Sequence, residues 1–276
     1  MRTIEKNIIE EYTRYLTEEE KSPVTIAKYL RDITAFAAWV SKRSVEKKIM
    51  LEYKAYLISE YSPRSVNSIL SSLNSFLNYL GWYDCKIKML KIQKQIFTDI
   101  NRELTKSEYV RLLRAAKKNK RLYYLMQTIC ATGLRVSELR YINCEAVKAG
   151  QAEIHCKGKM RIVILPKRLC KILRQYIKEQ NIKNGAVFIT KTGKPLDRSN
   201  IWSEMKRLCN DAGVIRSKVF PHNLRHLFAR TFYSLQKDIV RLADILGHSS
   251  VNTTRIYIME SGDTHRRQIE RMNLLC

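Results

Sequence analysis

The sequence predicts a mainly α-helical protein with a small β-sheet, divided into two domains. Apolar residues recur every three or four positions through most of the chain, which is the period of amphipathic helices. Only residues 151–166 show two short apolar runs around a Lys-Gly turn, as a β-hairpin would. A lysine-rich stretch over residues 85–103 separates the two parts, and 276 residues with 45% hydrophobic content are enough for two buried cores.

The first part of the chain predicts a bundle of four helices. The first run begins at Ile4, and the third covers residues 44–59. Ser22 with Pro23 and Ser62 with Pro63 mark the starts of the second and fourth helices, because serine caps a helix N-terminus and proline fits its first turn. The fourth run ends before Gly81. We therefore expect an N-terminal helical domain over residues 1–98.

Residues 85–103 predict an extended basic linker. They place lysines among apolar residues, contain neither glycine nor proline, and have no amphipathic face over their whole length. Such a segment either follows a phosphate backbone or is an ordinary solvated connection, and the sequence does not decide between the two.

The second domain is expected over residues 99–276 and is mostly helical. Its pattern predicts a capped helix near residues 104–118, two helices within 121–142 and the hairpin of 151–166. A helix over 166–182, a short strand over 186–190 and further helices after residue 199 complete it.

The charge balance points to a polyanionic partner. The chain has 51 Lys plus Arg against 26 Asp plus Glu, a formal net charge of +25. Nucleic acid is the polyanion that such a folded basic chain is expected to bind, although charge does not separate a binder from an enzyme. Seven cysteines form no CxxC pair, which argues against zinc and favours reduced thiols in the cytosol.

The sequence contains no targeting or membrane signal. The N-terminus alternates charged and apolar residues, unlike a signal peptide, and no stretch approaches the roughly 18 apolar residues of a membrane helix. We expect a cytoplasmic protein with no membrane association.

Four short stretches carry candidate chemistry. They are ATGLRVSEL with Arg135, CKGKMR with Lys157, PHNLRH with His222 and Arg225, and LGHSSVNTTRIY with His248 and Tyr257.

Each stretch has another interpretation when it is taken alone. Arg135 could simply pair with Glu138 on a helix surface, and Lys157 could be a solvated turn lysine. The segment with His248 also suits a helix-turn-helix DNA reader, and Tyr257 could pack through its ring. Their shared order, with His248 nine residues before Tyr257, is what makes coincidence improbable.

Taken together, these stretches resemble the lambda-integrase family of tyrosine recombinases, whose compact members are the Xer-type enzymes. The resemblance covers motif order, spacing and overall length. The segments SPVTIAKYLRDITAFAAWV and SPRSVNSILSSLNSFLNYL also resemble helices of that family's core-binding domain, although this pattern is the weaker one. The resemblance implies a catalytic domain of the tyrosine recombinase type after the linker.

The resemblance also implies roles for the candidate residues. Arg135 and Arg225 would clamp the scissile phosphate, with His248 hydrogen-bonded to the same group. Tyr257 would form a 3′-phosphotyrosine, and Lys157 would protonate the leaving 5′ hydroxyl. No cofactor, metal or ATP is expected.

For two of these assignments, the sequence leaves a second residue open. The hairpin turn looks shorter than the family pattern, so Lys159 could replace Lys157. Tyrosine has an ordinary pKa of about 10 and needs a base in reach; His222 is the candidate, with His226 as its alternative.

The implied partners are double-stranded DNA recombination sites, bound by four protomers on two duplexes. The C-terminal segment SGDTHRRQIERMNLLC would then dock on a neighbouring copy, or else pack on its own subunit. Two other functions stay open from sequence alone: a DNA-binding regulator that makes no covalent bond, and a type IB topoisomerase. The sequence does not identify the DNA target or the element that is moved.

Overall fold

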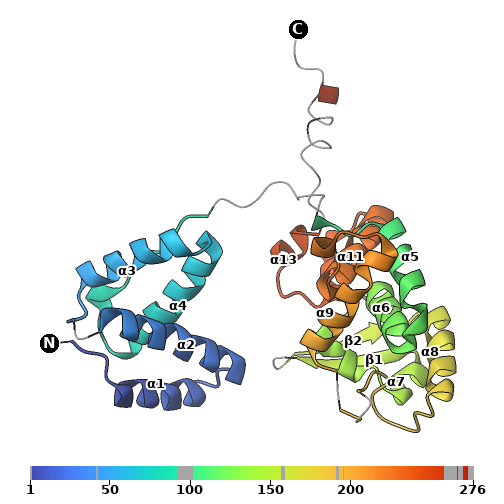
Figure 1. The fold of residues 1–276 in the computed structure, drawn as a ribbon, viewed down its shortest axis with the longest axis horizontal. Helices are drawn as coiled ribbons and strands as arrows, with labels where there is room; N and C mark the ends of the chain where they lie inside the picture. Colours follow the sequence, from blue (N-terminus) through green and yellow to red (C-terminus); the bar gives the residue numbers. More distant parts are fainter. Residues whose placement is uncertain are drawn as a thin grey trace. The chain divides into compact units, whose positions relative to one another are not determined.

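The computed structural model describes residues 2–41, 43–92, 102–156, 159–190, 193–194, 196–257, 266 and 270–272, and of Cys156 and Lys159 it describes the backbone only. The chain forms two compact units, residues 1–94 and 95–276, which are described separately (Figure 1).

The first unit is a bundle of four helices. They are α1 (Lys6–Glu18), α2 (Pro23–Val40), α3 (Lys47–Glu60) and α4 (Pro63–Tyr79), followed by the short 3₁₀ helix η1 (Tyr83–Cys85). The predicted starts are confirmed, because Ser22 Oγ accepts from the Thr25 N–H at 3.3 Å and Ser62 Oγ from the Ser65 N–H at 3.4 Å. Apolar side chains from all four helices form its core, including Tyr12, Phe36, Leu57 and Phe76.

The start of the predicted linker is fastened to α4 by two asparagines. Asn74 donates to the Ile87 carbonyl at 2.8 Å and accepts from the Ile87 N–H at 3.0 Å. Asn67 does the same with Leu90, at 2.9 Å and 2.7 Å. Residues 86–92 have no regular secondary structure, and these amides supply the partners that a neighbouring strand would otherwise give. Residues 93–101 of the predicted linker lie outside the described residues.

The second unit is mostly helical and contains a two-stranded antiparallel sheet (Figure 1). The predicted fold class is thereby confirmed. Its elements are α5 (Lys106–Ala115), η3 (Ala116–Lys118), α6 (Lys120–Thr132), η4 (Val136–Tyr141), α7 (Cys144–Ala149), β1 (Gln151–Cys156), β2 (Lys159–Ile164), α8 (Lys167–Glu179), α9 (Arg198–Arg207), α10 (Cys209–Ala212), η5 (Arg216–Lys218), α11 (Pro221–Gln236), α12 (Ile239–Leu246) and α13 (Val251–Arg255). The hairpin runs in register from the pair Gln151 and Ile164 to the pair Cys156 and Lys159.

One local prediction in this unit was wrong, and one predicted helix is of the 3₁₀ type. Residues 186–190 form no strand: Ala186 makes an isolated bridge with Asn143, and the Val187 N–H donates to the Ile142 carbonyl at 2.8 Å. The pairing goes no further because α7 begins at Cys144, directly after the extended Asn143. The second helix expected within residues 121–142 is the 3₁₀ helix η4.

Helix α11 packs on α6 in the core of the second unit. The C-terminal end of α6 is Gly133, with φ of 68°. A Cβ at Gly133 would lie 2.5 Å from Cδ1 of Phe228 on α11, so only glycine allows this approach. The close packing brings the end of α6 next to the first half of α11.

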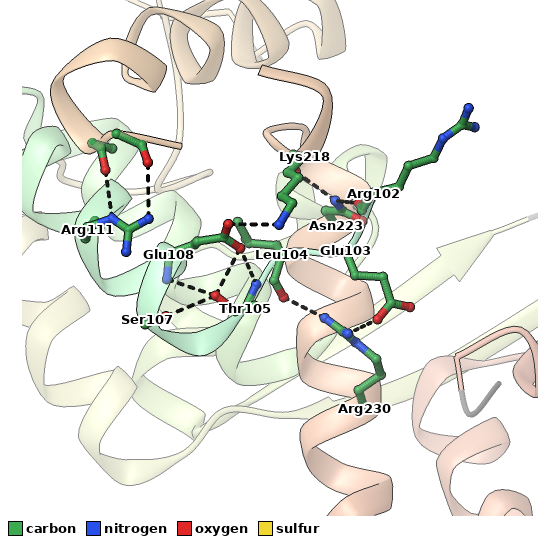
Figure 2. A network of polar contacts seen from close by, with 12 residues as sticks. Arg102, Glu103, Leu104, Thr105, Ser107, Glu108, Arg111, Lys218, Asn223 and Arg230 are labelled. Atoms are coloured by element: carbon green, nitrogen blue, oxygen red, sulfur yellow. Dashed lines mark hydrogen bonds and ion pairs between the residues drawn. The ribbon is translucent and has the colours of Figure 1, made fainter. Parts of the chain in front are cut away.

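A polar network also joins the start of this unit to α11 and η5 (Figure 2). Asn223 donates to the carbonyls of Arg102 and Lys218, both at 2.7 Å, and Arg230 donates to the Leu104 carbonyl at 2.6 Å. Lys218 pairs with Glu108 on α5 at 2.9 Å. The position of α11 is therefore fixed by polar contacts as well as by its apolar face.

No helix in the described part of the chain is long and apolar enough to cross a membrane. Five described cysteines are unpaired thiols: Cys85, Cys130, Cys144, Cys170 and Cys209.

Candidate active site

The structure brings all the predicted site residues together except Lys157, which lies outside the described residues. Arg135 immediately precedes η4, and His222 and Arg225 lie on the first turns of α11. His248 follows α12, and Tyr257 follows α13. The site thus forms where the end of α6, α11 and the last two helices meet.

Glu138 holds Arg135 in place. The Arg135 Nη1 donates to Glu138 Oε1 at 3.0 Å, and the Arg135 backbone N–H donates to Glu138 Oε2 at 2.8 Å. The Arg135 side chain keeps 35% exposure, whereas that of Glu138 is 1% exposed. A buried carboxylate therefore anchors a guanidinium that still reaches solvent.

Arg161 on β2 is a second partner of Glu138 that the sequence did not reveal. Its Nη1 donates to Oε1 at 2.7 Å and its Nη2 to Oε2 at 3.0 Å, a bidentate pair. Burial raises the pKa of Glu138, but the bonds from Arg161 and from Arg135 outweigh burial and hold this pKa below its usual value. Glu138 stays ionised and joins η4 to the hairpin.

Arg225 is a buried cation held by neutral acceptors. Its side chain donates to the Gly133 carbonyl at 2.6 Å, to the Leu246 carbonyl at 2.9 Å and to His248 Nε2 at 2.8 Å. The residue is 1% exposed, and among the described residues it makes no ion pair with a carboxylate. Burial lowers the pKa of Arg225, and the nearby Arg135 lowers it further. A buried guanidinium that bonds to no carboxylate among the described residues is suited to an anionic ligand.

Two guanidinium N–H groups here have no hydrogen-bond partner among the described side chains. They are the Nε atoms of Arg225 and Arg161, both buried. Buried donors are nearly always paired in folded proteins, so these two N–H groups are available to an acceptor from outside the chain. A phosphate group supplies several acceptor oxygens and negative charge at once.

His248 lies between Arg225 and α13. Its Nδ1 is 2.8 Å from Thr254 Oγ1, while its Nε2 faces Arg225. Burial lowers the pKa of His248 to about 4, with Arg225, Arg135, Arg161 and His222 adding to the effect. The ring is therefore neutral at pH 7.

The Tyr257 ring is surrounded by three histidines. His226 meets it edge-on with ring centroids 4.5 Å apart, His248 stacks on it at 5.7 Å, and His222 lies at 6.2 Å. Tyr257 is 2% exposed, and it also raises the pKa of Arg225. The phenol and the buried guanidinium thus lie close enough to interact.

The histidines of α11 are neutral. Burial lowers the pKa of His222, and Arg225 and Arg135 lower it further. Burial also lowers the pKa of His226, to about 3. A neutral imidazole can accept a proton, whereas an imidazolium cannot. The His226 ring packs edge-on against the rings of both Tyr257 and His222. His226 is therefore a packing residue as well as a titratable group.

The hairpin approaches the site through Arg161. Lys157 is outside the described residues, and Lys159 ends the paired register opposite Cys156. The choice between the two lysines stays a prediction. In the described part of the chain, no group of three or more His, Cys, Asp or Glu residues could hold a metal ion.

The comparisons with known proteins agree with this geometry. The family model described as "Phage integrase family" matches residues 102–262, which is more than half of the chain. The model "Phage integrase, N-terminal SAM-like domain" matches residues 9–83. The chain belongs to the phage integrase family.

Relatives of this phage integrase family member match over nearly its whole length. Tyrosine recombinase XerA of Thermococcus kodakarensis is 30% identical, over 97% of this chain and 96% of the relative. Tyrosine recombinase XerD of Listeria monocytogenes is 29% identical over 91% and 93%. A crystal structure of XerA recombinase matches with a TM-score of 0.54 and 26% identity, covering 98% of this chain and 99% of that one. The fold also matches a lambda integrase dimer bound to a COC′ core site, with a TM-score of 0.75, 18% identity, and 93% and 95% coverage.

Two residues of this integrase site escaped the sequence analysis. Arg161 stands between apolar residues in a strand, a pattern that gives no sign of a buried ion pair. Thr254 is 0% exposed and bonds to His248, yet its neighbour Thr253 is exposed and looks the same in sequence. The one signal for Arg161 in the sequence is that it is a charged residue between apolar neighbours in a strand.

Proposed function

We propose that this protein is a site-specific tyrosine recombinase that cleaves and rejoins double-stranded DNA through a 3′-phosphotyrosine at Tyr257. The observation that carries the proposal is the buried Arg225, which has no carboxylate partner among the described residues and an unpaired Nε–H, and which interacts with the buried Tyr257. A basic chain with 51 Lys plus Arg and full-length Xer relatives supports DNA as the anion.

The phosphate would be bound by two guanidinium groups. Arg225 offers its Nε–H from the buried side, and Arg135 offers the donors that Glu138 does not use from the exposed side. In the transition state, charge develops on the non-bridging oxygens, and preorganised donors stabilise it because they need not reorient. His248 is in contact with Arg225 and lies at the same phosphate position.

Proton transfers complete the reaction. The Tyr257 oxygen attacks phosphorus and its proton passes to His222, which is neutral and therefore able to accept it. The bond between phosphorus and the 5′ oxygen breaks, and Lys157 on the hairpin donates a proton to that oxygen. The covalent bond retains the free energy of the phosphodiester, so a second 5′ hydroxyl can reverse the steps without ATP.

The whole-length similarity to Xer recombinases favours strand exchange over the two other functions. A DNA-binding regulator has no need of a buried tyrosine beside a phosphate-binding arginine. A type IB topoisomerase would share the chemistry, but the full-length relatives XerA and XerD are tyrosine recombinases. We place the protein in the cytoplasm, on recombination sites in duplex DNA.

Assembly on two duplexes as a tetramer is part of the proposal. Two solved structures with a similar fold are a lambda integrase tetramer bound to a Holliday junction and XerH bound to its difH substrate. The C-terminal segment, of which only residues 266 and 270–272 are described, would contribute to contacts between copies.

A covalent-adduct experiment tests the function. Duplexes selected by the protein from a randomised pool would be nicked near their centres, incubated with protein without magnesium, and separated on a denaturing gel. We expect a slow-migrating adduct with the wild type and none with Tyr257→Phe, which should retain DNA affinity because one hydroxyl adds little to many phosphate contacts. Tyr83→Phe, at a 66% exposed tyrosine, is the control and should form the adduct. An adduct with Tyr257→Phe would remove Tyr257 from the mechanism.

A further inference from the structure

Thr254 touches both His248 and Tyr257. Its hydroxyl oxygen is 2.8 Å from His248 Nδ1, and its carbonyl accepts the Tyr257 backbone N–H at 2.9 Å. The residue is 0% exposed, whereas the adjacent Thr253 is exposed. A single buried threonine therefore joins the candidate nucleophile to the histidine of the phosphate site.

The hydrogen bonds around His248 have a defined direction. An arginine side chain has five N–H donors and no acceptor, so Arg225 Nη2 must donate to His248 Nε2 across 2.8 Å. A neutral imidazole carries one proton, which must then be on Nδ1. Nδ1 therefore donates to Thr254 Oγ1. The opposite tautomer would place two N–H groups against each other at Arg225.

Among the described residues, Nδ1 is hydrogen-bonded to the uncharged Thr254 and to no charged group. The groups that act on the His248 ring are Arg225 and His222 from α11, Arg135 from the start of η4 and Arg161 from β2. All of these are cations or a neutral histidine, and each disfavours the protonated ring. The uncharged hydroxyl of Thr254 is the acceptor that keeps the Nδ1 proton in place.

We propose that Thr254 is a positioning residue that fixes His248 as the Nδ1–H tautomer and sets the backbone of Tyr257 against it. The Nε2 lone pair then faces Arg225 while the phosphate site is empty of DNA. When a DNA phosphate binds, Nε2 is the nitrogen that either changes its hydrogen-bond partner or gains a proton. Thr254 continues to accept the hydrogen bond from Nδ1. The proposal rests on the proposed function and adds a residue to it.

The test compares Thr254→Val with Thr254→Ser, and Thr253→Val serves as the matched exposed control. Valine preserves the shape and removes the hydroxyl, whereas serine keeps the hydroxyl. Nitrogen-15 NMR of the DNA-free protein, assigned with His248→Gln, reports which ring nitrogen carries the proton. Single-turnover cleavage of the nicked duplex and DNA affinity are measured on the same proteins.

We expect the wild type to show a protonated Nδ1 and an unprotonated Nε2, and Thr254→Val to lose this preference. Cleavage should fall roughly ten- to a hundred-fold in Thr254→Val, because a buried donor loses its acceptor, while DNA affinity stays unchanged. Thr254→Ser and Thr253→Val should stay within about threefold of the wild type.

Two results would overturn the proposal: a wild-type spectrum with the proton on Nε2, or a Thr254→Val protein with wild-type cleavage. The first needs no variant, so it decides the question even if Thr254→Val fails to fold. Failure of the proposed function looks different, because the wild type would then form no adduct while its histidine spectrum still reported the tautomer.

Discussion

Replacing Glu138 by glutamine tests the carboxylate that joins Arg135 to the hairpin. Glutamine has nearly the same shape but no charge, and its amide nitrogen would face donors. Glu138 accepts four bonds: from Arg161 at 2.7 and 3.0 Å, and from the side chain and backbone of Arg135 at 3.0 and 2.8 Å. Whichever oxygen is replaced, two of these bonds are lost.

The expected cost follows from burial. Removing one partner of a buried ion pair costs about 3 to 5 kcal/mol, and we expect Glu138→Gln to fall near the lower end, about 3 kcal/mol. The Arg135 side chain is 35% exposed and that of Arg161 is 16% exposed, so water replaces part of the lost interaction. Cleavage should fall as well, because Arg135 loses its anchor. Glu145→Gln, at an exposed glutamate of α7, is the control and should change little.

The pH dependence has a definite sign. The folded-state pKa of Glu138 lies below its ordinary value of 4.5, so its contribution is complete above pH 4.5 and is lost as the pH falls through the folded-state pKa. Urea unfolding of wild type and variant, from about pH 7 to about pH 3, should show the two stabilities converging in acid. A cost below about 1 kcal/mol at neutral pH, or a pH-independent difference, would refute the buried ion pair as the stabilising element.

Two further predictions concern stability around the site. Gly247→Ala should lower the free energy of unfolding by about 2 kcal/mol, as measured by thermal unfolding. The reason is that φ is +64° and the new Cβ would lie 2.5 Å from Cδ of Arg161. Gly213→Ala is the control and should cost less, because φ is +58° but no atom lies within 4 Å. The pKa of His226 falls from 6.5 to about 3 in the folded state, so its contribution is complete above pH 6.5 and is lost as the pH falls toward 3. His226→Phe keeps the edge-on contact with Tyr257 and should flatten the acid loss of stability by up to about 1.4 kcal/mol per pH unit; an unchanged slope in urea titrations would contradict a neutral buried His226.

The sequence by itself determined the family and most of the helices. Helix starts at Ser22 and Ser62 depend on a side chain and a backbone N–H three residues apart, so they can be predicted from local sequence. The order and spacing of the four motifs carried the resemblance to tyrosine recombinases, which the comparisons confirm. The candidate residues Arg135, His222, Arg225, His248 and Tyr257 were named from the same spacing, and the structure brings them together.

The tertiary structure alone decided which side chains are buried around that site. Alternation in β2 would place Met160, Ile162 and Ile164 toward a core, yet they are 64%, 56% and 76% exposed. The inward face instead carries Arg161, because Glu138, far away in sequence, supplies the buried charge that it needs. Likewise, Thr254 is buried against His248, whereas the adjacent Thr253 is exposed. Such pairings depend on which segments meet in space, and local sequence does not contain that information.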